Sequence, residues 1–389
     1  MDKVRFGVIG AGGMGAHHAG YINSIDGAVL AAVCDADRAR AQGVAEKLGA
    51  VAWTDPNELL ASGKVDAVLV ATPHHFHCEI ARAALSRGIH VLSEKPQAVS
   101  ISDARRTNAA YEKVRDRTRY GMMLQMRTSP MYRKVRDLVQ GGELGEITRI
   151  TWIVTNWFRT CAYYASGGWR ATWAGEGGGV LINQCPHNLD LIQWIPAMMP
   201  SRVTAVGFVG KRHPIEVEDE ISAILEYPNG AVGHFIASTG EAPGTDRLEI
   251  CGDRGRIVVE RGQIAFSRTR QSVKEVNETS SEPFASIETW DISIPYAGGW
   301  SEGHRIVTQA FVNSILRNEP MIAEGPEGTK SLELGNAMAM SGLLRTPVEL
   351  PLDGEKYDLF LKDMAARYGG RKSLKTRESV VDMTKSWHP

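Results

Sequence analysis

The sequence lacks an excess of charge of either sign. Its 389 residues include 44 Lys and Arg against 45 Asp and Glu, which gives a formal net charge of -1 at pH 7. Proteins that bind nucleic acid or anionic membranes usually carry a basic surplus. We therefore expect neither kind of partner, and a small molecule is the favoured ligand.

Paired cysteines and long hydrophobic runs are also missing. The five cysteines are odd in number, widely scattered and without a CxxC pair, which argues against a disulfide framework and a structural zinc site. No run approaches the ~18 apolar residues that a membrane span needs, and the first residues enter a strand pattern without a signal segment. We predict a cytoplasmic protein and no metal site.

The residues that are present form two patterns of secondary structure. From residue 4 to about 124, short β-rich runs alternate with helical stretches, as in a parallel sheet. Successive strand-like runs then indicate a mainly antiparallel sheet, and amphipathic helices are expected over 304–320 and 327–345. The strand-like runs are 147–157, 202–209, 219–227, 231–238, 246–251 and 256–260. We predict domains over 1–125 and 126–370 and a polar C-terminal arm over 371–389.

The glycines include one GxGxxG motif, at Gly10, Gly12 and Gly15. Such glycines allow a tight turn and a close approach of the backbone to a pyrophosphate, and this motif follows a predicted strand and opens a predicted helix. Asp35 ends the second strand, where its carboxylate would bind the ribose hydroxyls and repel a 2′-phosphate. The pattern predicts NAD as the cofactor. NADP remains the alternative, because Arg38 could bind a 2′-phosphate. The other interpretation of Arg38 is a solvent-exposed charge on a helix.

The segment SEKPQ (93–97) stands at the end of the predicted fifth strand. Ligands of open parallel sheets bind beyond the carboxyl ends of the strands, so we expect Lys95 on the nicotinamide side of the crevice. The alternative is a surface pair of Glu94 and Lys95 in a turn.

Residues 177–194 have the length of a helix but carry Pro186 in the middle. Because proline has no N–H group, the helix should bend or loosen there. At 3.6 residues per turn, Asn183, His187 and Asp190 share one face, and apolar residues share the opposite face. The polar face predicts a functional site. The alternative is a buried helix whose polar stripe meets another element.

Taken together, these motifs resemble the Gfo/Idh/MocA oxidoreductases: GAGGMG, ATPHHFH (71–77), EKP and a glycine-rich helix with N-x-x-x-H-x-x-D. The resemblance covers nearly the whole chain. It implies an α/β fold with an N-terminal Rossmann domain and a C-terminal α/β domain, whose large, mainly antiparallel open sheet often serves in oligomer contacts. It also implies hydride transfer to or from a sugar, an inositol or a related polyol.

By position, the resemblance implies that Lys95 is the catalytic lysine and His187 the acid/base histidine. Many members have aspartate where this chain has Asn183, and a carboxamide only orients groups where a carboxylate would stabilise a protonated imidazole. Asn183 therefore either lowers the pKa of His187 or binds a substrate hydroxyl, with Asp190 or Lys95 supporting the base. The residues assigned to the cofactor are Gly10, Gly12, Gly13, Met14, Gly15, Asp35, Arg38, Thr72, Pro73, His77, Glu94, Lys95 and Gln125.

Aromatic residues are concentrated between 152 and 194, where five of the nine tryptophans lie. Flat rings can cover the apolar faces of a pyranose, and arginine or asparagine side chains can bond its hydroxyls or an acidic group. The alternative for each ring is packing within the second domain, and for Arg127 it is a structural ion pair. The residues assigned to the substrate are Arg127, Asn156, Tyr163, Trp169, Arg170, Asn183, His187, Tyr296 and His304.

Three functions are compatible with these motifs. The first, which uses all of them, is an NAD-dependent dehydrogenase acting on a ring hydroxyl of a pyranose, glycoside, anhydrosugar or inositol. The second is a redox-neutral glycosidase that oxidises, eliminates, hydrates and reduces with the same residues, without accumulating NADH. The third is a nucleotide-binding regulator, which the presence of both Lys95 and His187 disfavours. In each case we expect a homo-oligomer, a dimer or a tetramer.

Overall fold

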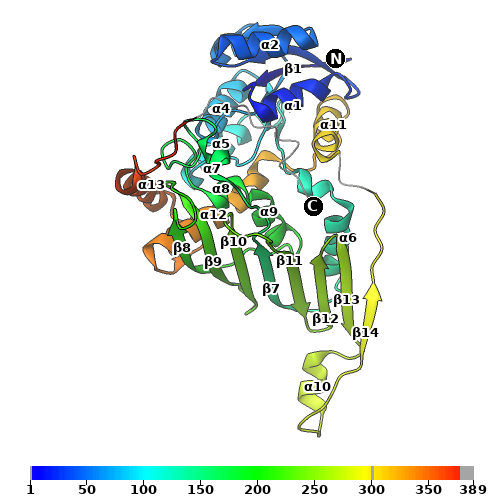
Figure 1. Ribbon diagram of the computed structural model, residues 1–389. Helices are drawn as coiled ribbons and strands as arrows, with labels where there is room; N and C mark the ends of the chain where they lie inside the picture. Colours follow the sequence, from blue (N-terminus) through cyan, green and yellow to red (C-terminus); the bar gives the residue numbers. More distant parts are fainter. Residues whose placement is uncertain (1, 299–301, 377–389) are drawn as a thin grey trace.

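The computed structural model of the chain describes residues 2–298 and 302–376. Two sheets lie one above the other in the view of Figure 1, with helices between and around them. The first sheet is parallel and the second is mostly antiparallel. The α/β fold predicted from the sequence is therefore confirmed.

The first sheet is built from strands that alternate with helices. The elements in chain order are β1 (Val4–Ile9), α1 (Gly13–Ile22), β2 (Ala28–Cys34), α2 (Arg38–Leu48), β3 (Val51–Trp53), α3 (Pro56–Ala61), β4 (Ala67–Val70), η1 (His74–Phe76), α4 (His77–Ser86), β5 (His90–Ser93), α5 (Ile101–Glu112), β6 (Tyr120–Met122) and η2 (Gln125–Thr128). The strand order is β3-β2-β1-β4-β5-β6, all parallel. Strand β4 is buried along its whole length, as expected where helices cover both faces of a sheet.

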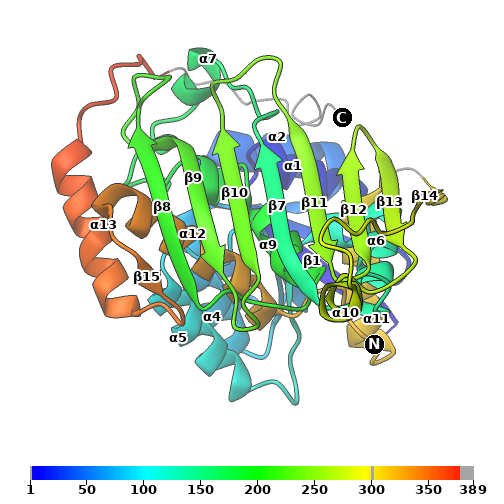
Figure 2. The same cartoon turned by 90° about the horizontal axis from the view of Figure 1, so that it is seen from below.

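Within the described residues, the second sheet has nine strands, and helices cover one of its faces. The elements in chain order are α6 (Pro130–Gln140), β7 (Ile147–Val154), α7 (Cys161–Ala165), α8 (Val180–Asn183), α9 (Pro186–Trp194), β8 (Arg202–Val209), β9 (Glu218–Glu226), β10 (Val232–Ser238), β11 (Asp246–Gly252), β12 (Gly255–Glu260), β13 (Gln263–Thr269), α10 (Val273–Thr279), β14 (Thr289–Ser293), α11 (Gly303–Leu316), η3 (Gly325–Glu327), α12 (Gly328–Leu344), β15 (Val348–Glu349) and α13 (Gly354–Tyr368). The strand order is β14-β13-β12-β11-β7-β10-β9-β8-β15, in which β7 and β10 pair in parallel. Helices α8, α9 and α12 pack on the face towards the first sheet, and Figure 2 looks onto the opposite face.

The helix predicted over 177–194 is broken into α8 and α9. Pro186 is the first residue of α9, a position where a missing N–H group costs no hydrogen bond. Just before the break, the N–H of Cys185 donates to the carbonyl of Val180 at 2.9 Å. The apolar face points into the core, where Leu181, Cys185 and Leu189 are buried. The break changes the direction of the chain between Asn183 and His187, which the sequence predicts to act together.

Helix α11 packs on the first sheet although it lies far beyond residue 125, where the sequence analysis places the domain boundary. Val307, Phe311 and Val312 belong to the same buried cluster as β1. The rings of Phe6 and Phe311 have centroids 6.2 Å apart. The chain therefore returns from the second sheet to complete the core of the first.

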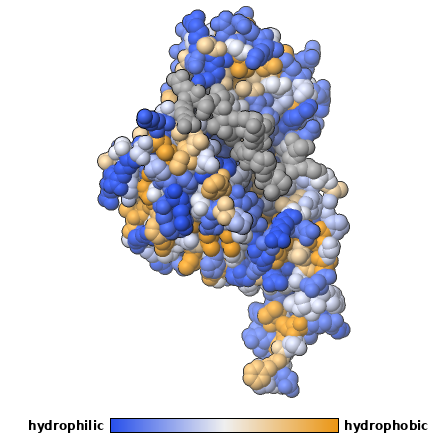
Figure 3. Space-filling view, viewed as in Figure 1, coloured by the Kyte–Doolittle hydropathy of each residue, from blue (hydrophilic) through white to orange (hydrophobic). Residues whose placement is uncertain are grey.

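An arm that the sequence analysis did not predict projects from the second sheet. It is the connection between β13 and β14, which contains α10, and it extends to the bottom of Figure 1. Helix α10 buries none of its residues, and Phe284 beyond it is 99% exposed. Figure 3 shows hydrophobic residues gathered at the end of this arm.

A buried ion pair joins the end of the first sheet to α9. Arg127, in η2, donates from Nε and Nη2 to both carboxylate oxygens of Asp190, each at 2.7 Å. Its Nη1 donates to Glu327 in η3. Arg127 is only 3% exposed and Asp190 only 1%. Of the two interpretations of Arg127 from the sequence, this geometry supports the structural ion pair.

We expect Arg127→Ala to destabilise the protein, because it leaves the carboxylate of Asp190 buried without its partner. The free energy of unfolding should fall by about 3–5 kcal/mol, as measured by urea denaturation. Arg133→Ala, at an exposed position of α6, is the control and should change stability by less than about 0.5 kcal/mol. Equal stability of the two variants would contradict a role of this ion pair in joining the sheets.

Candidate active site

A cleft of about 510 Å³ lies at the carboxyl ends of β1, β2, β4 and β5. This is the edge at which open parallel sheets bind their ligands. Residues after all four strands line it, and the loop 166–170 and the end of α8 line its other side. The lining residues are Gly10, Gly12, Gly13, Met14, Asp35, Asp37, Arg40, Ala71, Thr72, Pro73, His74, His77, Glu94, Lys95, Ser166, Gly167, Trp169, Arg170 and Asn183.

The glycine-rich turn leaves the backbone bare where α1 begins. A Cβ atom on Gly15 would lie 1.7 Å from the carbonyl oxygen of Gly10, so the helix could not approach the strand as closely with any other residue. Within the described chain, Gly12 has 4 Å of free space at its Cβ position, and no side chain caps the helix. Uncapped amides at a helix N-terminus are a suitable site for a pyrophosphate. These features fit a bound dinucleotide.

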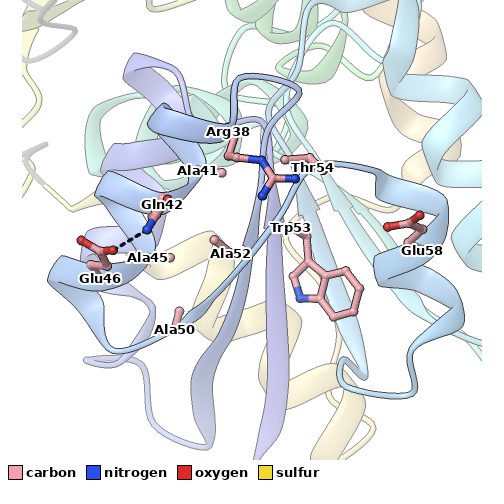
Figure 4. A pocket seen from close by; sticks show the side chains of 10 residues that line it. All are labelled: Arg38, Ala41, Gln42, Ala45, Glu46, Ala50, Ala52, Trp53, Thr54 and Glu58. Carbon is pink, nitrogen blue, oxygen red and sulfur yellow. Dashed lines mark hydrogen bonds between the residues drawn. The ribbon is translucent and has the colours of Figure 1, made fainter.

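Asp35 lies in this cleft with a basic neighbour. Its carboxylate accepts hydrogen bonds from the N–H of Ala11 at 2.8 Å and of Asp37 at 2.9 Å, which ties the glycine turn to the end of β2. Arg40 approaches it at 3.2 Å. Arg38 instead lines a separate hollow between α2, β3 and α3, where Figure 4 shows it beside Thr54. The arginine closest to the expected ribose position is thus Arg40, not Arg38.

The turns after β4 and β5 are fixed to each other by His77. Its two ring nitrogens lie 2.8 Å from the carbonyl oxygens of Pro96 and Thr72. Within the described residues, the buried hydroxyl of Thr72 has no hydrogen-bond partner. Since Thr72 and Pro73 line the cleft, this hydroxyl is available to a ligand there.

Lys95 crosses the cleft to the broken helix. Its ammonium donates to the carbonyl oxygen of Asn183, the last residue of α8, at 2.8 Å. Burial lowers the pKa of Lys95 below its usual value of 10.5, although the neighbouring carboxylate of Glu94 opposes this shift. An ammonium has three N–H donors, so this contact leaves two for a ligand.

Glu94, beside Lys95, is held as a buried carboxylate. Nε2 of His18 donates to it at 2.7 Å, and Nδ1 of the same ring lies 2.6 Å from the hydroxyl of Tyr21. Burial alone would raise the pKa of Glu94, but the hydrogen bond from His18 and nearby positive charges outweigh it and lower the pKa. His304 stacks edge-on against His18, at 5.4 Å between ring centroids. The structure thus places His304 beside Glu94, within the set of groups that surrounds Lys95.

His187 is 3% exposed and lies against η2. The side-chain nitrogen of Gln125 donates to Nε2 of its ring at 3.0 Å. Burial, assisted by the positive charge of Lys95, lowers the pKa of His187 well below 6.5. The imidazole is therefore neutral near pH 7, which suits a proton acceptor. One of the two alternatives from the sequence attributes a lowered pKa to Asn183, whereas the first cause in the structure is burial.

Asn183 and Asp190 both have partners other than His187. The amide nitrogen of Asn183 donates to the buried carboxylate of Glu176, and Asp190 is engaged by Arg127. Glu176 was not identified from the sequence, because a single acidic residue in a glycine-rich loop gives no sign of its partner.

The substrate side of the cleft contains part of the aromatic segment. The guanidinium of Arg170 lies 4.5 Å from the ring centroid of Tyr163 and 4.8 Å from that of Trp169, and its Nη1 donates to the hydroxyl of Tyr163 at 2.7 Å. Of the residues that the sequence analysis assigned to the substrate, Trp169, Arg170 and Asn183 line the cleft. The others do not: Arg127, Asn156, Tyr163, His187, Tyr296 and His304. Tyr296 lines a hollow beside β13 and β14, where its hydroxyl donates to Gly262. Among residues 2–298 and 302–376 we find no group of three His, Cys, Asp or Glu that could hold a metal ion.

Comparison with known proteins identifies relatives of both the N-terminal and the C-terminal part of the chain. Residues 4–122 match the oxidoreductase family with an NAD-binding Rossmann fold, and residues 132–258 match the GFO/IDH/MocA C-terminal domain. The chain is 26% identical to scyllo-inositol 2-dehydrogenase (NAD(+)) of Bacillus subtilis (strain 168), over 90% of this chain and 96% of that protein. It is 27% identical to D-glucoside 3-dehydrogenase of Escherichia coli (strain K12), over 90% and 98% respectively.

A solved structure has the same arrangement of sheets. The WlbA dehydrogenase from Bordetella pertussis, crystallised in complex with NADH and UDP-GlcNAcA, matches with a TM-score of 0.76 and 27% identity, over 90% of this chain and 100% of that chain. An uncharacterised oxidoreductase of Streptococcus pneumoniae serotype 4 is 31% identical over 70% of this chain and 75% of its own length. Matches to both halves, in order and at this coverage, show that the chain belongs to the GFO/IDH/MocA family of NAD-binding oxidoreductases.

Proposed function

We propose that this oxidoreductase transfers hydride between NAD and a ring hydroxyl carbon of a sugar, glycoside, anhydrosugar or inositol. The observation that carries the proposal is the position of Lys95. Its ammonium lies between the cofactor-binding turns and the broken helix, in a cleft that also contains Trp169 and Arg170. The relatives named above act on inositols and glucosides, which supports this substrate class.

The chain's own residues supply the proton transfer and the charge stabilisation. NAD, when bound, accepts the hydride at C4 of its nicotinamide. Nε2 of His187 carries a lone pair, which accepts the hydrogen bond from Gln125. We assign the proton of the substrate hydroxyl to this lone pair, in a bound state in which the hydroxyl replaces the amide of Gln125. The ammonium of Lys95 stabilises the negative charge that develops on the substrate oxygen, and it does so more strongly in the transition state than in the ground state. The reverse reaction uses the same groups.

The homo-oligomer and the cytoplasmic location stay predictions. Val206, Phe208, Ile224 and Val232 are partly exposed on β8, β9 and β10, and this face of the second sheet supports the proposal of contacts between copies of the chain. No helix in the described residues is both long and apolar enough to cross a membrane.

We expect Lys95→Met and His187→Ala each to lower kcat by about 10²–10⁴-fold, as loss of a general base or of a stabilising charge does. NADH formation is followed with a panel of inositols, sugars, anhydrosugars and aryl glycosides, and NADH binding by fluorescence verifies that the cofactor site persists. Lys64→Met, at an exposed position, is the control. Full activity of either site variant would remove that residue from the mechanism. Release of an aglycone without NADH would instead establish a redox-neutral glycosidase.

For alcohol oxidation, kcat/KM should fall at both low and high pH. The pKa of His187 is lowered, so its neutral form persists below pH 6.5 and activity declines only as the pH falls through that lowered pKa. The pKa of Lys95 is also lowered, so the ammonium is lost as the pH rises towards 10.5 and before that value is reached. Kinetics with saturating NAD measure both limbs. An acid limb centred above pH 6.5 would contradict the assignment of His187.

Preference for NAD should depend on the balance between Asp35 and Arg40. In Asp35→Ser the carboxylate that repels a 2′-phosphate is gone while Arg40 remains, so the ratio of kcat/KM for NADP to that for NAD should rise at least about tenfold. The double variant Asp35→Ser/Arg40→Ala should lose most of this gain. An unchanged ratio in the single variant would show that Asp35 does not select the cofactor.

A further inference from the structure

The chain beyond α13 lies against the substrate side of the cleft. The sequence analysis assigned residues 371–389 to a polar arm, but residues 369–374, which we call the strap, run from α13 towards α7 (Figure 2). The N–H of Gly370 donates to the carboxylate of Glu216 at 2.8 Å. Leu374 packs against the core of the second sheet. Residues 377–389 lie outside the described chain.

Lys372 is the side chain of the strap that reaches the cleft wall. Its ammonium donates to the carbonyl oxygen of Arg170 at 2.7 Å and to that of Gly167 at 3.4 Å. Gly167 and Arg170 line the cleft, whereas Lys372 does not. The lysine therefore contacts the outer side of a loop whose inner side faces the ligand space.

The same loop has a backbone conformation that requires support. Ala171 has φ +57°, a left-handed conformation that residues with a Cβ atom seldom adopt. Its N–H donates to the carboxylate of Glu176 at 2.5 Å, and its carbonyl accepts from the N–H of Glu216 at 3.2 Å. Glu216 thus contacts both the loop, through its backbone, and the strap, through its side chain.

We propose that Lys372 is a positioning residue for the sugar site, which fixes Trp169 and Arg170 at the cleft by holding the backbone of loop 166–171 from outside. This inference rests on the proposed function. It adds a determinant of substrate binding that lies in the last part of the described chain and touches neither cofactor nor substrate.

The kinetic test compares Lys372→Met, which keeps the apolar stem and removes the three N–H donors, with the wild type. Because the loop binds substrate away from the reacting atoms, KM for the sugar or inositol should rise about tenfold, the effect of losing charge-assisted hydrogen bonds, while kcat changes less than about twofold. Lys372→Arg should restore most of the affinity. Lys375→Met, at an exposed position three residues on, is the matched control and should behave as the wild type.

A second measurement does not depend on turnover. Hydrogen exchange of the peptide over residues 163–176 should be faster in Lys372→Met than in the wild type and in Lys375→Met, since the loop has lost its outer contact. Equal exchange rates and an unchanged KM in Lys372→Met would overturn the proposal, and so would an equal rise in both lysine variants. If the wild type oxidises no sugar or inositol, the proposed function fails, and the exchange comparison alone then supports or overturns the role of Lys372 in holding the loop.

Discussion

The hydrogen bond from Lys95 to the carbonyl oxygen of Asn183 joins the two sheets at the cleft. This hydrogen bond requires that the carbonyl of Asn183 is not already bonded within a helix. The last carbonyls of a helix have no partner within it, and α8 ends at Asn183 because the chain turns before Pro186. The proline therefore acts on the site indirectly: it ends one helix, frees an acceptor for the ammonium and starts the next helix one residue before His187.

Burial and neighbouring charges set the protonation states of the titratable groups around this hydrogen bond. Glu94 stays ionised although it is buried, because His18 donates a hydrogen bond to it. Burial instead lowers the pKa of His187 and keeps its imidazole neutral. Lys95 interacts electrostatically with both the carboxylate of Glu94 and the imidazole of His187. An ammonium beside a neutral imidazole is the combination that a hydride-transferring site needs, with one group to stabilise an alkoxide and the other to receive its proton.

Local patterns in the sequence predict the frame of the site well. The glycine motif and Asp35 depend on residues close together in the chain, and the break at Pro186 follows from the chemistry of one residue. Contacts between distant segments are not predictable in this way. No local pattern links Arg127 to Asp190, which lies 63 residues further along the chain. The contact of Glu176 with Asn183 likewise depends on the fold of the loop between them. Tyr296 is an aromatic residue of the kind that can bind a sugar, but it lies in a hollow beside β13 and β14.

The return of α11 to the first sheet has a consequence for the order of synthesis. The ribosome completes β6 long before it makes Phe311, which covers Phe6 in the final structure. Domains commonly fold as the nascent chain emerges, N-terminal first. Here the NAD-binding half leaves the ribosome with part of one apolar face of β1 covered by α1 and the rest still uncovered. It can complete this core only after most of the second sheet has been translated.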